Sequence, residues 1–199
     1  MSTHWDGRYD RDDYFFGTAP NDFLVETAGQ VNKGKTLCLA DGEGRNGVFL
    51  AEQGFDVTSI DASRVGLGKA RQLAAERGVQ VSFEQADLFT HDLGDSKWDL
   101  AVSIFFHMPS DRRAEVHRRV ARAIKPGGYL ILEAYTPKQL EYGTGGPPTA
   151  DMLQTADILR DDFATLDIVS LIERDRQVVE GPGHTGDAAV VQLLARRPR

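Results

Sequence analysis

A single cysteine, Cys38, stands among the 199 residues of this chain. One cysteine excludes an intramolecular disulfide bond and any metal site built from several cysteines, and we expect the protein to hold no metal. Cys38 lies in the middle of an apolar run, which favours a small core residue over a reactive nucleophile. The chemistry of the protein must therefore come from other side chains.

Long apolar runs and excess positive charge are also missing. No segment has the length and apolar character of a membrane span, and residues 1–13 lack the apolar core of a signal peptide. The 23 Lys and Arg against 30 Asp and Glu give a net charge of −7, whereas nucleic-acid phosphates are bound by clustered cations. We interpret the five arginines between positions 112 and 122 as a solvated helix face. We expect a cytoplasmic protein, a monomer or homodimer, with no nucleic-acid or membrane partner.

Glycine, by contrast, is concentrated in one short stretch. The apolar strand predicted at 36–40 is followed at once by three glycines, Gly42, Gly44 and Gly47. Such a turn can adopt positive φ and lie close to a ligand, and a helix then opens with its N-terminal amides facing that ligand. The next strand, 56–60, ends at Asp61, where a carboxylate can accept both hydroxyls of a ribose. The pattern predicts a nucleoside-binding half-site.

Beyond this half-site, helices and strands alternate as in a doubly wound sheet. The pattern predicts helices at 63–77, 110–124 and 151–159, and strands at 79–86, 98–105, 129–135, 166–179 and 188–195. Segment 136–149 is rich in glycine and proline, and we expect a lid loop there. The eight residues EGPGHTGD before the last strand are only long enough for a hairpin, so that strand is expected to run antiparallel. The chain is predicted to be one α/β domain.

Two cofactors are compatible with the glycine-rich turn. Gly42 to Gly47 satisfies the G-x-G-x-x-G fingerprint of NAD-binding proteins, which is weak by itself. A dehydrogenase normally needs a further mononucleotide half and a substrate domain, for which 199 residues leave little room. A small NAD(P)-dependent oxidoreductase is therefore an alternative hypothesis. A non-enzymatic cofactor-binding module is another.

Three segments together resemble one family. LADGEGRNGVFLAEQGFDV is similar to its first motif, ADLF to its acidic motif after the third strand, and AIKPGGYLILEAY to its turn and fifth strand. Over nearly its whole length the chain resembles a class I S-adenosylmethionine-dependent methyltransferase. The segment WDGRYDRDDYFFGTAPNDFL and the compact length resemble the small tellurite-resistance and thiopurine methyltransferase-like branch. The family implies a Rossmann-like seven-stranded sheet of order 3-2-1-4-5-7-6 and S-adenosyl-L-methionine as cofactor.

The resemblance divides the chain into an N-terminal cap segment at 1–32, a cofactor-binding core at 33–135, and a lid loop with the terminal hairpin at 136–199. The chain departs from the family pattern at two positions. The family has an acid in the first strand and a glycine at the start of the turn, where this chain has Cys38 and Ala40. Asp41 or a backbone carbonyl could replace that acid toward the ammonium group of the cofactor.

The resemblance also assigns roles on the cofactor side. Gly42 and Gly44 let the backbone approach the methionine part, while Asp61 holds the ribose. Asp87 would accept from the adenine amino group, although it could also be a loop acid or a cap. Residues of the N-terminal segment are expected to close over the cofactor, the alternative being an arm packed on the sheet edge. The expected cofactor-binding residues are Arg8, Tyr14, Phe16, Asp41, Gly42, Glu43, Gly44, Asn46, Asp61, Ala62, Ser63, Asp87, Leu88 and Ser103.

Three residues are candidates for catalysis: His107, Tyr135 and His184. His107 ends the fourth strand, opposite the sulfonium in this fold. We place His184 in the hairpin loop, which should emerge at the carboxyl edge of the sheet on the side of the cofactor. Either histidine could instead be structural or solvated. The expected reaction is methyl transfer to a small-molecule nucleophile, with a sulfur, selenium or tellurium, oxygen or nitrogen acceptor left open.

Overall fold

Seven strands form one sheet within residues 2–199, the part of the chain that the structure, a computed structural model, describes. Their order is β3-β2-β1-β4-β5-β7-β6, and β7 runs antiparallel to both of its neighbours. The predicted fold class is confirmed. The strands are β1 (Lys35–Leu39), β2 (Asp56–Asp61), β3 (Ser82–Gln85), β4 (Trp98–Ile104), β5 (Ile124–Tyr135), β6 (Asp167–Glu180) and β7 (His184–Arg196).

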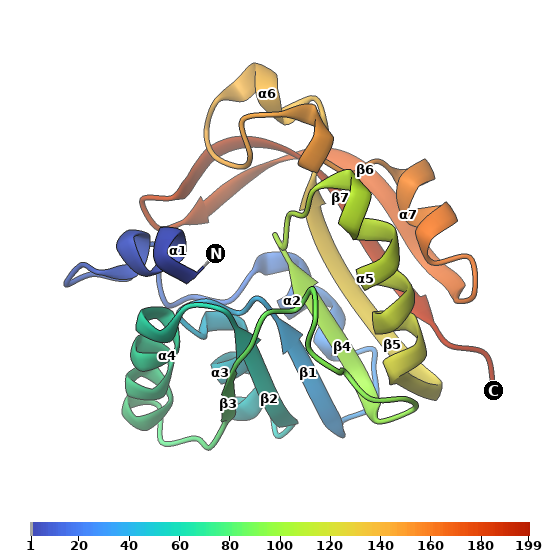
Figure 1. Cartoon of the computed structure of the whole chain (residues 1–199), viewed down its shortest axis with the longest axis horizontal. Coiled ribbons are helices and arrows are strands. Elements are labelled where there is room, and N and C mark those ends of the chain that lie inside the picture. The colour runs from blue at the N-terminus through green and yellow to red at the C-terminus, as the bar shows by residue number, and fades with distance from the viewer. Residues whose placement is uncertain (1) are drawn as a thin grey trace.

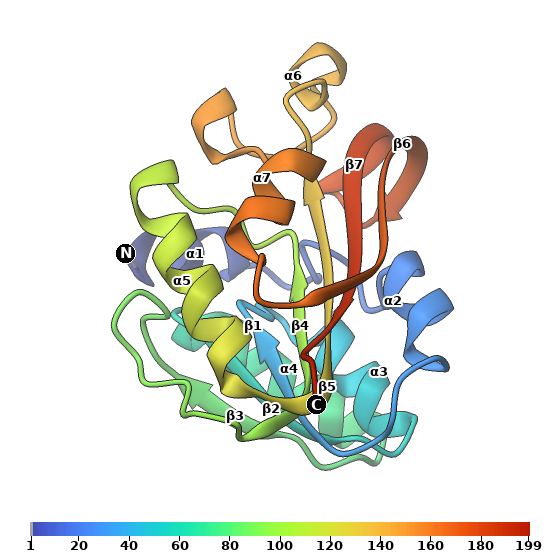
Figure 2. The ribbon, with the colours of Figure 1, turned by 90° about the vertical axis from the view of Figure 1, so that its right-hand side faces the viewer.

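Helices cover both faces of this sheet. α5 and α7 lie on one face, and α2 and α3 lie on the other (Figure 2). α1 lies apart from these layers, near the carboxyl ends of the central strands (Figure 1). The helices are α1 (Ser2–Tyr9), α2 (Asp22–Ala28), α3 (Arg45–Glu52), α4 (Arg64–Glu76), α5 (Ser110–Ala123), α6 (Gln139–Tyr142) and α7 (Ala156–Asp162), with a 3₁₀ turn at Ala150–Met152.

The core has two sides because side chains alternate across each strand. Leu37 and Leu39 of β1 pack with residues of α5 and α7, whereas Cys38 packs with Leu50 of α3 on the opposite face. Burying one such leucine stabilises the fold by about 1.5 to 3 kcal/mol. Cys38 is 1% exposed, and burial raises the pKa of its thiol. The prediction that Cys38 is a core residue is confirmed.

Two breaker-rich segments differ from their predicted structure. The predicted turn after Ile124 lies inside β5, where a φ of 82° at Gly127 and a register shift between Trp98 and Leu100 absorb the irregularity. The segment 136–149 contains the one-turn helix α6, which ends at Gly143 in the left-handed conformation. Proline and glycine thus mark irregular backbone in both places without excluding a regular element.

Several element boundaries also differ. β3 is shorter than predicted, and the helix expected at 151–159 is a 3₁₀ turn followed by α7. β6 and β7 extend so far toward each other that only residues 181–183 separate them. The N-terminal segment contains two helices that were not predicted. The division at residues 32 and 135 stays a prediction.

Candidate functional site

A cavity of about 690 Å³ opens at the carboxyl edge of the sheet. α1 and the ends of β1, β2 and β4 line one side, and the lid loop and the β6–β7 turn line the other. This is the edge at which open α/β sheets bind ligands. The predicted residues that line it are Arg8, Phe16, Asp41, Gly42, Glu43, Asn46, Asp61, Ala62, Asp87, Leu88, His107 and His184.

Five predicted residues do not line the cavity: Tyr14, Gly44, Ser63, Ser103 and Tyr135. Ser63 caps α4 by accepting from the Gly66 amide at 3.0 Å. Gly44 has a φ of 87°, and a side chain there would collide with α4. The Tyr14 hydroxyl donates to the Lys69 carbonyl at 3.2 Å, away from the cavity. Ser103 is buried within β4. These residues lie outside the cavity and pack against the segments that line it.

The Asp61 carboxylate is oriented by backbone donors. One oxygen accepts from the Gly42 amide at 2.8 Å, and the other accepts from the Ser63 amide at 2.7 Å. The side chain is 6% exposed, and burial raises its pKa above the ordinary value, an effect that these two bonds oppose. Each oxygen keeps a second lone pair, so the group fits a ligand that offers a pair of hydroxyls.

Asp41 lies beside Asp61 and is turned toward the protein. Its carboxylate accepts from the Ser59 hydroxyl at 2.6 Å and from the Gly47 amide at 3.2 Å. The second bond caps α3, whose own cap residue has no side chain. Burial raises the pKa of Asp41 to about 7, with the Asp61 charge adding to that shift. A cation placed here would favour the ionised form, so the site fits an amino group.

Backbone strain marks the ends of two neighbouring strands. Ala40 follows β1 with a φ of 50°, and Phe105 follows β4 with a φ of 53°. Side chains seldom adopt this left-handed region, and each instance costs on the order of 1 kcal/mol. Both residues line the cavity. Ala40 therefore holds the backbone conformation that suits the glycine of the family at that position.

Tyr9 of α1 is a site residue that sequence reasoning missed. It is 5% exposed and lies so close to the glycine turn that a Cβ on Gly42 would come within 2.5 Å of its hydroxyl. The Trp5 ring stacks on it at 5.7 Å. The aromatic cluster of the N-terminal segment was the available signal. The choice among its members required the helix phase of α1, which the sequence analysis did not predict.

A lysine of α4 fastens the N-terminal segment to the glycine turn. Lys69 Nζ donates to the carbonyls of Tyr9 and Asp13 at 3.2 and 2.6 Å, and it pairs with a Glu43 oxygen at 2.5 Å. Glu43 also accepts from the Phe16 amide at 3.3 Å. Glu43 thus serves the cap and the turn together.

A side chain of α5 holds the loop that follows β3. The Asp87 carboxylate accepts from the Phe89 amide at 2.9 Å, which closes its own turn. Arg119 donates to the Leu88 carbonyl at 3.0 Å, and Arg113 pairs with Asp162 at 2.9 Å. The interpretation of the arginine cluster as a solvated face is therefore wrong for these two: Arg119 holds the loop after β3, and Arg113 holds the end of α7.

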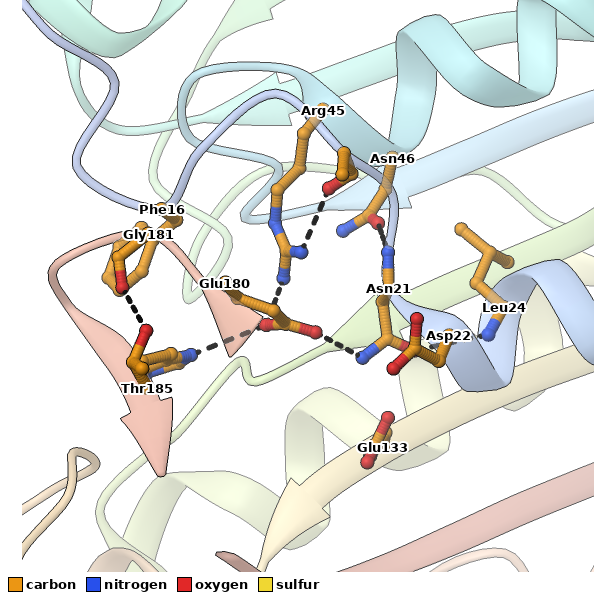
Figure 3. Close-up of polar contacts among 12 residues, drawn as sticks. Phe16, Asn21, Asp22, Leu24, Arg45, Asn46, Glu133, Glu180, Gly181 and Thr185 are labelled. Atoms are coloured by element: carbon orange, nitrogen blue, oxygen red, sulfur yellow. Dashed lines mark hydrogen bonds and ion pairs between the residues drawn. The ribbon is translucent and has the colours of Figure 1, made fainter. Parts of the chain in front are cut away.

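A buried ionic cluster connects α3 to the hairpin. Glu180, the last residue of β6, accepts from Arg45 Nη2 at 2.6 Å and from Asn21 Nδ2 at 2.8 Å (Figure 3). Nδ1 of His184 lies 3.5 Å from the same carboxylate. Although burial alone would raise the pKa of Glu180, these three neighbours lower it to about 2. The sequence alone does not bring Arg45 and Glu180 together, because 135 positions separate them along the chain.

The prediction that His184 lies in the hairpin loop is wrong. His184 is the first residue of β7 and is paired with Glu180 of β6. It is 7% exposed, and its ring contacts Phe16 and Phe105 at centroid distances of 4.6 and 4.7 Å. Burial lowers its pKa, although Glu180 opposes that shift. The predicted position on the cofactor side of the sheet holds, because β6 runs parallel to β5 and delivers this turn to the carboxyl edge.

His107 and Tyr135 stack in parallel, with ring centroids 5.6 Å apart. His107 Nδ1 lies 3.3 Å from the Met152 carbonyl, and burial lowers the pKa of this histidine to about 4. Burial raises the pKa of Tyr135, which is 1% exposed and packs behind Phe105. Tyr135 thus packs against the rings of Phe105 and His107 and lies outside the lining of the cavity.

The described residues 2–199 contain no group of three or more His, Cys, Asp or Glu placed to hold a metal ion. No helix in this part of the chain has the length and apolar character needed to cross a membrane.

Comparison with known proteins agrees with the site. Residues 37–128 match a family model described as a methyltransferase domain. The chain is 31% identical over 113 residues to a 2-heptyl-1-hydroxyquinolin-4(1H)-one methyltransferase of Mycobacteroides abscessus, covering 55% of this chain and 49% of the relative. It is 25% identical to the probable S-adenosyl-L-methionine-dependent methyltransferase TehB of Haemophilus influenzae, covering 62% and 45%. The chain spans about half the length of these curated relatives.

Among solved structures, one from work on the conversion of a disulfide bond into a thioacetal group during echinomycin biosynthesis superimposes with a TM-score of 0.82. It covers 100% of this chain and 92% of the other at 24% identity, which supports the fold. These matches agree with the resemblance to S-adenosylmethionine-dependent methyltransferases that was noted in the sequence. Residues 37–128 of the chain are thus similar to a methyltransferase domain, and the whole chain has the fold of the solved neighbour.

Proposed function

We propose that this protein transfers the methyl group of S-adenosyl-L-methionine to a small-molecule acceptor. One observation carries the proposal: a single cavity joins a carboxylate and glycine half, at the ends of β1 to β3, to an imidazole and aromatic half. The first half suits a nucleoside with an amino acid chain, and the second suits a separate acceptor. The cofactor, when bound, supplies an electrophilic methyl group on a sulfonium.

On the cofactor half, Asp61 would hold the ribose hydroxyls, and Asp41 would face the amino group. Asp87, with the neighbouring Leu88 amide, would hold the adenine. Phe105 offers an aromatic face between the two halves, and a face of this kind attracts a sulfonium. The strained backbone at Phe105 fixes the direction of that ring.

On the acceptor half, the walls hold the nucleophile in line with the methyl group and exclude water. Positioning of this kind supplies most of the catalysis of an in-line displacement. His184 and His107 are the groups that could accept a proton there, because burial lowers the pKa of each and keeps it neutral near pH 7.

Calorimetry tests the cofactor assignment directly. We expect S-adenosylmethionine and S-adenosylhomocysteine to bind the full chain, and NADH to give no enhanced fluorescence. Absence of binding at millimolar ligand would refute the proposal, and tight NADH binding would favour the oxidoreductase hypothesis, which the methyltransferase domain match argues against.

Cofactor binding without methyl loss in a broad nucleophile screen would favour a regulatory module instead. The remaining sequence predictions are finer: a cytoplasmic monomer or homodimer without nucleic-acid or membrane partners, resembling the tellurite-resistance branch. These stay predictions.

A further inference from the structure

Two histidine rings line the acceptor half of the cavity, and Nδ1 of each faces an oxygen that can only accept. His107 Nδ1 faces the Met152 carbonyl at 3.3 Å, so the proton of the neutral ring belongs on Nδ1. Its Nε2 is buried and has no hydrogen-bond partner among residues 2–199. His107 therefore presents an unsatisfied lone pair to the cavity that it lines.

His184 reaches the same tautomer through a different neighbour. Its Nδ1 lies 3.5 Å from Glu180, which Arg45 and Asn21 hold in its ionised form. A carboxylate accepts and does not donate, so the proton again belongs on Nδ1 and the lone pair on Nε2. Glu180 also provides the negative charge that stabilises His184 once it takes up a second proton. His107 has no such carboxylate partner.

The remaining acceptor wall is apolar. It consists of Phe16, Phe105, Phe106 and Met152, with the lid residues 145–148. Among residues 2–199, the arginines that line the cavity are Arg8 and Arg45: Arg45 is paired with Glu180, and the Arg8 guanidinium lies over the Trp5 ring, 5.4 Å from its centroid, on the cap. An anionic group placed against the two Nε2 atoms would meet a lone pair on each ring and no donor from either.

We propose, on the basis of the proposed methyl transfer, that the acceptor is a neutral, small aromatic molecule whose nucleophile is a hydroxyl or amino group carrying its own proton. The hydrogen-bond donors of that group satisfy the Nε2 atoms of His107 and His184. Oxyanions such as selenite, tellurite or a carboxylate are rejected because they bring negative charge and oxygen lone pairs against the lone pairs of these two nitrogens.

The chemical step balances within the cavity. The nucleophile forms a bond to the methyl carbon as the carbon–sulfur bond breaks, and sulfur keeps the electron pair of that bond as a neutral thioether. The proton of the nucleophile moves to Nε2 of His184, whose new charge is compensated by Glu180. His184 is thus the catalytic base, His107 orients the nucleophile, and Glu180 is a positioning residue.

Acceptor binding tests the substrate class. Catechol and aniline are compared with benzoate, selenite and tellurite by calorimetry on the full chain saturated with S-adenosylhomocysteine. We expect the protic neutral ligands to bind at least about tenfold more tightly than the oxyanions, a difference of about 1.4 kcal/mol. Equal or tighter binding of the oxyanions overturns the proposal, and so does failure of both classes to bind below about 10 mM.

Turnover of the protic acceptors, measured as S-adenosylhomocysteine release, tests the base. His184→Gln is expected to lose about 100-fold or more in turnover, while Glu180→Gln should also shift the pH dependence of the rate. His91→Gln is the matched control, because His91 pairs with Glu84 outside the cavity. Unchanged cofactor affinity in each variant shows that the fold and the cofactor half persist.

Equal turnover of His184→Gln and His91→Gln overturns the proposed base. His107→Gln offers a second check, because its loss should weaken binding of the protic acceptor without affecting the cofactor. If the wild-type chain fails to bind S-adenosylhomocysteine, methyl transfer itself is refuted. If the cofactor binds and only oxyanions are methylated, methyl transfer stands and the acceptor class proposed here is wrong.

Discussion

The two halves of the cavity are built in opposite ways. The cofactor half takes Asp41, Gly42 and Asp61 from one strand–turn–helix–strand unit, and backbone amides orient its carboxylates. The acceptor half takes His107 from the loop after β4 and His184 from the start of β7; the Met152 carbonyl faces His107, and the Arg45–Glu180 pair lies beside His184. The first half is acidic and contiguous in sequence, whereas the second is uncharged at its surface and assembled by the fold.

This difference indicates which half of the cavity tolerates substitution of single residues. A contiguous unit held by backbone bonds keeps its geometry when other segments vary. An acceptor half assembled from single residues of several segments can be altered one residue at a time. The two halves should therefore respond separately to mutation, and the following changes test that separation.

Asp61→Ala should have the largest effect on the cofactor half. It removes the acceptor for the ribose hydroxyls and leaves the Gly42 and Ser63 amides without their partner. We expect cofactor affinity to fall by at least tenfold, since charge-assisted hydrogen bonds are worth about 1.5 to 3 kcal/mol. Calorimetry with S-adenosylhomocysteine measures it. A folded variant with unchanged affinity would contradict the role assigned to Asp61.

Asp41→Asn should change how stability depends on pH. The pKa of Asp41 is raised to about 7 in the folded protein, so its contribution to stability is present at low pH and is lost as the pH rises through 7. Between about pH 5.5 and 8.5 the wild type should lose about 2 kcal/mol of unfolding free energy through this group. The variant should lack that loss in denaturant titrations. Identical slopes in both proteins would show that Asp41 is ionised throughout.

Lys69→Met should loosen the cap. It removes the donor to two backbone carbonyls and leaves Glu43, which is 3% exposed, without its cation. We expect faster amide exchange in α1 and a cofactor affinity weaker by about threefold to tenfold, because a buried carboxylate without a partner is unfavourable by about 1 to 3 kcal/mol. Lys33→Met at an exposed position is the control. Unchanged exchange in α1 would show that the cap is held by Tyr9 alone.

Ala40→Gly should have the smallest effect, and a favourable one. At a φ of 50° the Ala40 side chain is strained, and glycine removes that strain. We expect the unfolding free energy to rise by about 0.5 to 1 kcal/mol, measured by denaturant titration. A loss of stability would mean that the Ala40 methyl group contributes packing that outweighs the strain.

The sequence predicted the cofactor half in detail because its signals are local. The glycines, Asp61 and Asp87 follow predicted strands directly, so their placement needs only the strand order. The Arg45–Glu180 pair could not be predicted, because 135 positions separate its members and their contact depends on how β6 returns to the sheet. His184 was placed on the correct edge by topology but in the wrong element, since the strands extend further through Gly and Thr residues than propensity suggests.

The N-terminal segment was predicted to cover the site, but its helix was not. Charged and aromatic residues alternate there without an apolar stripe, and among residues 4–9 Tyr9 is the one that is buried. The family resemblance led to Tyr14 as a cofactor-binding residue and did not lead to Tyr9. Lys69 donates to the Tyr9 and Asp13 carbonyls, and these bonds fix which side of the N-terminal segment faces the cavity.

The two amide bonds on Asp61 have a further consequence for the thermodynamics of binding. A carboxylate free to rotate loses conformational entropy when a ligand fixes it, and this loss opposes association. In this protein the Gly42 and Ser63 amides have already fixed the side chain before any ligand arrives. That loss is included in the folding free energy, and more of the interaction with the ribose hydroxyls can appear as affinity.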